Sequence, residues 1–567
     1  MAGTERADER TATGAPASAP AVIGVVGAGT MGSGIAQLAA RAGARTLLHD
    51  PIAQALERGI DRARDGLAKE ASKGRLSEDD AQAAGERLER VDEIAALAPC
   101  ELVIEAEPER LELKHELYTQ LSGIVASDCV LASNTSSLLV TAIAAAATHP
   151  ERVVGMHFFN PAPVMRLLEV VAGEQSSPEA LAIAEGAGAA MGKVVIRAHD
   201  GPGFLVNRCN RPFGLEGLRL LQERISDVET IDRICRLEGG FRMGPFELMD
   251  LVGVDTGFEI AKSFFAQSFG EPRWRPSPIS ARYVAAGLYG RKSGRGFYDY
   301  GGGGAAGTSG TPYRSEDPPA PESRSPEHGE GVVVISGAGV LADELRLTAG
   351  QAGYEIRTTT APSGDMLPAL IIDCDSMPPQ RLQPPGGGAS HLAAQPSHGA
   401  RLLLCAGGSL GALDPGGSAV GFHVLPPFAE AGLVELTRSE SSSPGAAARA
   451  ERFFEALGKH VAWVGDAPGL VLGRIVCQLI NESAFALGEG VGSAEDIDTG
   501  MVLGLSHPRG PLQWADAIGL EHVLAVLEGL SAEYREERYR PAPALRGLSQ
   551  EGRMGRSSGA GFFEYPA

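Results

Sequence analysis

Short apolar runs alternate with helix-length amphipathic segments in the first third of the chain. The runs are AVIGVVG from Ala21, RTLLHD ending at Asp50, ELVIEA from Glu101 and RVVGMHFF from Arg152. This alternation predicts strand–helix–strand units and a parallel sheet. Over 199–300 the pattern changes to longer segments of helix length, which predicts a mostly α-helical domain.

The same strings return in the second half of the chain. His157 pairs with His423 and Glu169 pairs with Glu435, each 266 residues later. The same offset relates PGFLVNR to PGLVLGR and GPFELMD to GPLQWAD. One offset that holds over several separate matches indicates a tandem duplication.

The composition between and before the two copies differs from that of the copies themselves. Residues 1–20 lack an apolar core and are predicted to be a disordered tail, and the Gly-, Pro- and Ser-rich segment 301–330 is predicted to be a flexible linker. We expect each copy to hold a doubly wound α/β sheet followed by an all-α domain: 21–198 and 199–300, then 331–466 and 467–567.

A glycine-rich turn follows the first predicted strand. Gly27, Gly29 and Gly32 form a GxGxxG that opens a helix, which allows a tight turn, close approach of a pyrophosphate and close helix–strand packing. Asp50 closes the second strand, 18 residues after Gly32, where an acid binds ribose hydroxyls and repels a 2′-phosphate. The pattern predicts a Rossmann-type domain that binds NAD in preference to NADP.

Two polar residues end neighbouring apolar runs. His157 closes one run and Glu169 closes the next. A lone His on an apolar strand is more often a core residue, but at the carboxyl end of a doubly wound sheet it would face the cofactor crevice. A carboxylate beside it would fix its tautomer, as a general base requires. The SNTSS run at 133–137 and Asn207 offer polar groups to a substrate in the same crevice.

Charge and cysteine content exclude several classes of protein. The 567-residue chain has a formal net charge of -21 and no basic stripe, which argues against a nucleic-acid binder. Its seven scattered cysteines form no CxxC, which indicates reduced thiols in a cytoplasmic protein and no metal site. No apolar run reaches the roughly 18 residues that span a bilayer, so we expect no membrane segment.

Residues 21–300 resemble the L-3-hydroxyacyl-CoA dehydrogenase family through GAGTMGSGIAQLAA, SNTSSL, GMHFFNPAPVMRLLEVV, DGPGFLVNR, GPFELMDLVG and GRKSGRGFYDY. The tandem arrangement resembles bacterial 3-hydroxybutyryl-CoA and 3-hydroxyadipyl-CoA dehydrogenases, including those of phenylacetate catabolism. The resemblance implies reversible NAD-dependent oxidation of a (S)-3-hydroxyacyl-CoA thioester to 3-oxoacyl-CoA, as in the β-oxidation of fatty acids, with a short acyl chain.

The resemblance also implies roles for individual residues. His157 would be the general base, paired with Glu169, while Ser136 and Asn207 would orient the substrate oxygens. The family positions near the nicotinamide half of the cofactor are matched by Ser136, Glu109, Lys114, Asn160 and Lys292.

Two features make parts of this assignment less specific. Glu107 stands where the family usually has an apolar residue, in the string IEAEPERLELK. Lys69 and Lys73 match basic residues associated with the CoA phosphates, but such a charge run also suits a solvated helical face.

The second copy keeps His423 and Glu435 but has lost the residues around them. The positions of Gly32, Asp50, Ser136, Asn207 and Lys292 are taken by Ala342, Thr360, Gly408, Gly473 and Ser557. We therefore expect one active site and a structural second copy. Since the helical domains of this family pair in dimers, we expect a homodimer or an internal pseudo-dimer of 467–567 on 200–300.

Two other functions remain open at this stage. Relatives that act on a free β-hydroxy acid or on gulonate share the glycine turn and the helical domain. A nucleotide-binding sensor without activity would suit the second copy, but not the first, whose predicted site residues are intact.

Overall fold

The computed structural model describes residues 20–301, 313–319, 329–358, 368–375 and 399–566. Nearly all of the predicted tail, most of the predicted linker, and Thr360 lie outside these described residues. The chain divides into two compact units. The first unit is Met1–Val206 with Gly490–Leu505, and the second is Asn207–Glu489 with Ser506–Ala567.

An eight-stranded sheet forms the centre of the first unit, in the order β3-β2-β1-β4-β5-β6-β7-β8. Neighbouring strands are parallel, except that β6 and β7 are antiparallel. The strand order reverses between β1 and β4, so their carboxyl ends border the kind of crevice that binds dinucleotides. The strands are β1 (Val22–Val26), β2 (Arg45–His49), β3 (Leu88–Arg90), β4 (Leu102–Glu105), β5 (Val130–Ser133), β6 (Val153–Phe158), β7 (Leu167–Ala172) and β8 (Val194–His199).

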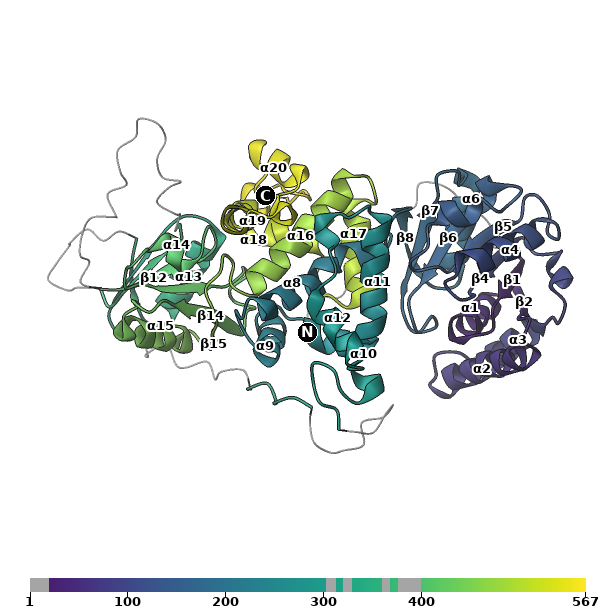
Figure 1. Cartoon of the computed structure of the whole chain (residues 1–567), viewed down its shortest axis with the longest axis horizontal. Coiled ribbons are helices and arrows are strands. Elements are labelled where there is room, and N and C mark those ends of the chain that lie inside the picture. Colours follow the sequence, from purple (N-terminus) through teal and green to yellow (C-terminus); the bar gives the residue numbers. More distant parts are fainter. Residues whose placement is uncertain (1–19, 302–312, 320–328, 359–367, 376–398, 567) are drawn as a thin grey trace. The chain divides into compact units, whose positions relative to one another are not determined.

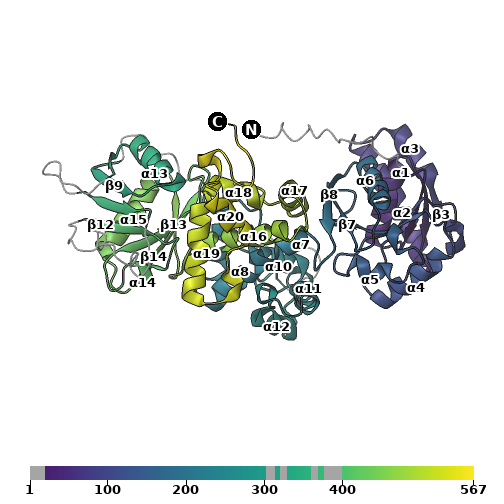
Figure 2. The ribbon, with the colours of Figure 1, turned by 90° about the horizontal axis from the view of Figure 1, so that it is seen from above.

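Helices cover both faces of this sheet. They are α1 (Thr30–Arg41), α2 (Ala53–Ser72), α3 (Glu78–Arg87), α4 (Leu111–Ser122), α5 (Val140–Ala144), α6 (Pro178–Ala190) and α17 (Ala494–Leu505). Figure 2 shows α1 and α6 on one side of the strands and α4 and α5 on the other. The helix α17 comes from the second copy, yet it packs on β7 and β8 of the first sheet.

The second unit holds a seven-stranded sheet in the order β10-β9-β11-β12-β13-β14-β15. It repeats the first sheet, and its described residues contain no counterpart of β3. Its strands are β9 (Val332–Ser336), β10 (Glu355–Arg357), β11 (Leu370–Asp373), β12 (Ala400–Leu404), β13 (Val420–His423), β14 (Leu433–Arg438) and β15 (His460–Trp463). Beside them lie α13 (Val340–Gln351), α14 (Leu410–Leu413) and α15 (Pro444–Ala456).

The rest of the second unit is helical. Its helices are α7 (Val206–Cys209), α8 (Arg211–Gln222), α9 (Val228–Leu237), α10 (Pro245–Val252), α11 (Val254–Gln267), α12 (Pro278–Ala285), α16 (Leu472–Gly488), α18 (Pro511–Ile518), α19 (Leu520–Tyr534) and α20 (Pro543–Gln550). All residues of α16 up to Ala486 are buried, and Figure 1 shows this helix beside α8. Among the described residues, no helix is long and apolar enough to cross a membrane.

Buried ion pairs join the helical parts of the two copies within the second unit. On α16, Arg474 Nε lies 2.7 Å from Glu216 Oε2 of α8, and its Nη1 lies 2.6 Å from Glu223 Oε2. The equivalent residues make the reciprocal contact, because Arg208 Nε lies 2.9 Å from Glu482 Oε1. Both sheets are thus followed by helical domains, in tandem, which confirms the predicted fold class.

Candidate active site

The glycine turn between β1 and α1 has the shape that a dinucleotide requires. Gly27 has φ +94°, and a Cβ there would lie 2.8 Å from the carbonyl oxygen of Ala106. A Cβ at Gly32 would lie 1.7 Å from the carbonyl oxygen of Gly27, so helix and turn approach too closely for any side chain. A Cβ at Gly29 would meet nothing within 4 Å, which leaves space in front of the turn for a phosphate group.

Asp50 lies at the same turn, directly after β2. Its Oδ2 accepts a hydrogen bond from the Ala28 amide at 2.8 Å, and its Oδ1 accepts one from the Ile52 amide at 2.8 Å. These two bonds fix the carboxylate beside the glycine turn. Each oxygen keeps a lone pair for a ribose hydroxyl.

The antiparallel pairing of β6 and β7 places His157 directly opposite Glu169. His157 Nδ1 lies 2.6 Å from Glu169 Oε2, and the carboxylate is fully buried. The other oxygen, Oε1, accepts hydrogen bonds from the amides of Leu205 at 3.2 Å and Val206 at 2.9 Å. A carboxylate held in this way assigns the Nδ1 proton to the imidazole and leaves Nε2 to accept a proton.

Aromatic rings hold the imidazole in place from two sides. The ring of Phe159 is 4.6 Å from that of His157, and the ring of Phe204 is 5.9 Å away, centroid to centroid. His157 is only 6% exposed, so its environment excludes most water. The pair is therefore both oriented and shielded, as a general base in a low-dielectric site needs to be.

The SNTSS run after β5 ties the His157 strand to the loop after β4. Asn134 Oδ1 accepts a hydrogen bond from the Phe158 amide at 2.9 Å. Glu109 accepts hydrogen bonds from Thr135 Oγ1 at 2.8 Å, from the Ser136 amide at 2.5 Å and from Ser136 Oγ at 3.1 Å. The sequence predicted roles for Ser136 and Glu109 but none for Asn134 and Thr135. The hydrogen bonds of these two residues hold the run in place.

Lys114 belongs to a buried network that the sequence patterns did not reveal. Its Nζ lies 2.6 Å from Glu105 Oε1, with both side chains 1% exposed, and 3.9 Å from Glu109 Oε2. Ser133 Oγ donates to the second oxygen of Glu105 at 2.6 Å. Glu105 ends β4 at the crevice, so Lys114 anchors α4 to the end of this strand. The one sequence signal for this network is Glu105 itself, a charged residue at the end of an apolar strand where the strand order reverses.

Glu107 adds a negative charge near the same turn. Burial raises the pKa of its carboxyl group, and the neighbouring carboxylates of Asp50 and Glu105 raise it further. Its Oε1 is buried and accepts no hydrogen bond from the described residues. A carboxylate at this position therefore opposes the binding of an anionic cofactor.

The remaining predicted residues are exposed or belong to the second unit. Lys69 and Lys73 are exposed at the end of α2, which leaves the CoA-binding and solvated-face interpretations both open. Asn160 is exposed after β6. Asn207 and Lys292 belong to the second unit, where Lys292 Nζ lies 2.6 Å from an oxygen of Asp255.

In the second copy an arginine side chain binds the turn between β9 and α13. The carbonyl oxygens of Ile335 and Gly337 both accept hydrogen bonds from the guanidinium of Arg346, the former at 3.1 Å. A Cβ at Gly473, the counterpart of Asn207, would lie 2.2 Å from Cε1 of His423. The histidine ring thus fills the space that an asparagine side chain would need.

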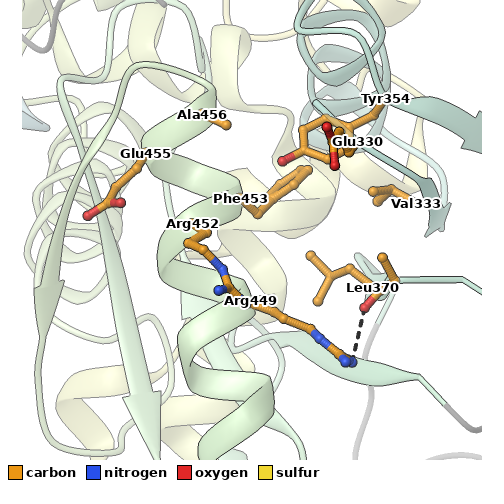
Figure 3. Close-up of a pocket in the computed structure, with 10 residues that line it drawn as sticks. Glu330, Val333, Tyr354, Leu370, Arg449, Arg452, Phe453, Glu455 and Ala456 are labelled. Atoms are coloured by element: carbon orange, nitrogen blue, oxygen red, sulfur yellow. Dashed lines mark hydrogen bonds between the residues drawn. The ribbon is translucent and has the colours of Figure 1, made fainter. Parts of the chain in front are cut away.

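A pocket of about 410 Å³ lies elsewhere in the second unit, along α15 (Figure 3). Figure 3 shows Arg449, Arg452 and Phe453 of α15 facing Val333 and Leu370 of the sheet. The pocket is lined by none of the predicted site residues. The candidate active site therefore lies in the first unit, where the carboxyl ends of β1, β4, β5 and β6 meet.

Known proteins share both the domain content and the tandem order. A family model described as 3-hydroxyacyl-CoA dehydrogenase, NAD binding domain, matches residues 22–201. The C-terminal domain of the same family matches twice, at 203–300 and 469–565.

Relatives extend this likeness to the full length of the chain. A 3-hydroxyadipyl-CoA dehydrogenase of Escherichia coli is 35% identical over 529 residues, which covers 92% of this chain and 96% of the relative. A crystal structure of 3-hydroxybutyryl-CoA dehydrogenase from Escherichia coli matches with a TM-score of 0.74 and 34% identity, over 94% of this chain and 99% of that one. A probable 3-hydroxybutyryl-CoA dehydrogenase of Deinococcus radiodurans is 40% identical and covers 49% of this chain and 99% of itself.

Proposed function

Because the chain belongs to the 3-hydroxyacyl-CoA dehydrogenase family, we propose that it catalyses the reversible NAD-dependent oxidation of (S)-3-hydroxyacyl-CoA to 3-oxoacyl-CoA. The observation that carries this proposal is the buried pair of His157 and Glu169, 2.6 Å apart, in the same unit as an intact glycine turn. The names of the relatives favour short substrates, such as 3-hydroxybutyryl-CoA or 3-hydroxyadipyl-CoA.

The residues of the first turn fit NAD. Gly27, Gly29, Gly32 and Asp50 would hold the dinucleotide, whose bound nicotinamide accepts the hydride from C3 of the substrate. The open space in front of Gly29 suits the pyrophosphate, and the Asp50 carboxylate disfavours the 2′-phosphate of NADP.

His157 is the general base in this proposal. Its Nε2 takes the proton of the 3-hydroxyl group as C3 loses its hydride, and the buried Glu169 carboxylate stabilises the imidazolium that forms. In the reverse direction the imidazolium returns the proton to the substrate oxygen. Ser136 and Asn207 orient the substrate oxygens.

The other family positions complete the site. We assign contacts with the nicotinamide half to Glu109, Lys114, Asn160 and Lys292, and contacts with the CoA phosphates to Lys69 and Lys73.

The test uses the purified full chain with NADH and acetoacetyl-CoA. We expect turnover with the thioester and none with free acetoacetate; equal rates on both would favour the free-acid alternative, and no turnover on either would favour the sensor. His157→Gln should lower kcat by about 10² to 10⁴ while NADH binding persists. His149→Gln is the matched control, because His149 forms an exposed pair with Glu151 at 3.0 Å. A panel of C4, C6-dicarboxyl and longer thioesters then assigns chain length.

The second copy takes the place of a second subunit in this proposal. The buried contacts of Arg474 and Arg208 join α8 and α16 as two symmetry-related halves. Light scattering should give a mass near 59.0 kDa, that of one chain. Deletion of 331–567 should expose α8 and cause association or loss of folding, and a stable, fully active monomer would contradict the internal pairing. All seven cysteines are buried and remain thiols, which supports a cytoplasmic location.

A further inference from the structure

The histidine and glutamate of the second copy do not form the pair that their counterparts form. His423 on β13 and Glu435 on β14 are directly opposite in the antiparallel register. Both side chains are fully buried, yet His423 Nδ1 has no hydrogen-bond partner among the described residues. The two oxygens of Glu435 each accept one backbone amide, from Val471 and Leu472, both at 2.8 Å. Each oxygen keeps a free lone pair.

A third side chain enters this cluster from the first copy. Glu238, at the C-terminal end of α9, is 7% exposed, and its Oε1 accepts a hydrogen bond from the Leu425 amide at 3.3 Å. Its Oε2 is buried and meets no N–H donor among the described residues, and its carboxyl group lies within hydrogen-bonding reach of that of Glu435. One carboxylate oxygen of Glu238, one of Glu435 and a ring nitrogen of His423 all lie within 4.8 Å of one another.

Fully ionised, this arrangement places two carboxylates face to face in a dry site. Among the described residues, no Lys or Arg forms an ion pair with either carboxylate. A cation of charge +2 would neutralise both groups and use the free lone pairs.

The far side of the imidazole is held as it is in many metal sites. His423 Nε2 lies 3.1 Å from Nε2 of His522, so one of the two nitrogens donates to the other. When His423 donates from Nε2, its Nδ1 carries the lone pair of the ring, which has no donor among the described residues. Metal-bound histidines characteristically donate their other N–H in this way.

We propose that Glu238, His423 and Glu435 bind a divalent transition-metal ion, with Zn²⁺ as the best fit. Zinc prefers a few nitrogen and oxygen ligands at about 2.0 to 2.2 Å, which places ligand atoms about 3.4 Å apart. The ligand atoms now lie within 4.8 Å of one another, so they must approach by up to about 1.4 Å around the ion. The ion would link the end of α9, from the first copy, to the sheet of the second.

The measurement is the metal content of the full-length chain. Because the three ligands are buried, the ion enters as the chain folds, so the protein is produced in Zn²⁺- or Co²⁺-supplemented medium and purified without chelators. We expect about one ion per chain, and for Co²⁺ the visible absorption of a low-coordinate site. A content below about a tenth of an equivalent with both ions would overturn the proposal and leave a shared proton between the carboxylates.

Substitutions then assign the ion to these residues. Glu238→Gln and His423→Gln should each lower Zn²⁺ affinity at least tenfold, as measured by chelator competition. His149→Gln, in the exposed His149–Glu151 pair, should keep the full content. If both cluster variants keep the ion at unchanged affinity, the proposal is wrong. Since the wild-type content is measured without a variant and without turnover, the result is independent of the dehydrogenase assignment.

Discussion

Gly504 on α17 offers a test of whether the second copy supports the active site of the first. A Cβ at Gly504 would lie 2.8 Å from Leu167 Cδ2 and 3.3 Å from both Phe159 Cε1 and Val206 Cγ1. Phe159 in turn packs against the imidazole of His157 at 4.6 Å. A larger residue on this helix should therefore displace the ring that orients the base.

The expected magnitude follows from competing effects. Overpacking a tight contact costs about 1 to 3 kcal/mol, while replacing a helical glycine by alanine returns about 1 kcal/mol. Gly504→Ala should thus be nearly neutral to mildly destabilising, and Gly504→Val should cost about 2 to 3 kcal/mol and lower kcat about 10- to 100-fold. Urea unfolding and acetoacetyl-CoA reduction by NADH measure these effects.

Gly547 on α20 is the matched control, because a Cβ there would meet nothing within 4 Å. Gly547→Ala should stabilise the chain by up to about 1 kcal/mol and leave the rate unchanged. If Gly504→Val behaved like the control in both measurements, α17 would not pack on the His157 site and the reasoning would fail.

Three further predictions concern charge. Arg474→Met should destabilise the second unit by about 3 to 5 kcal/mol, because the buried Glu216 loses its ion pair with this guanidinium. The urea midpoint should fall, and an unchanged midpoint would contradict this. Burial lowers the pKa of His507 to about 4, so the unfolded chain binds the proton more tightly, and stability should fall by about 3 kcal/mol from pH 6.5 to pH 4. His507→Gln should flatten this decline in urea titrations at several pH values, and an equally steep decline would refute the assignment. Glu107→Val should lower the KM for NAD⁺ about fivefold, because it removes a negative charge beside Asp50. The exposed control Glu112→Val should leave this KM unchanged. Equal effects of the two variants would rule out a local cause.

The fold and the centre of the site could be predicted because they depend on local pattern and on one repeat offset. The strands that hold His157 and Glu169 could be predicted from apolar runs, although Glu169 lies within β7 and not at its end. Antiparallel pairing brings the two residues into register. The glycine turn could be predicted because Gly27 and Gly32 leave no room for a side chain. Its neighbour Asp50 followed from spacing alone.

Contacts between distant segments could not be predicted in this way. Glu105 looked like any residue at the end of an apolar strand, and only the three-dimensional structure shows Lys114 and Ser133 converging on it. Similarly, the patterns of α17 and of α9, which Glu238 follows, reveal only which face of each helix is apolar. Which sheet α17 and Glu238 contact depends on packing between the two copies, and a single sequence does not reveal that packing.

The offset of 266 residues places Glu238 at the same position as Gly504. In an assembly of two identical subunits, one substitution changes both sides of the twofold axis at once. A glycine beside one histidine and a glutamate beside the other could then never coexist. Joining both halves in one chain removes that constraint, so each half can mutate alone. A fused chain can therefore have different residues around its two histidines, whereas a symmetric dimer of identical subunits cannot.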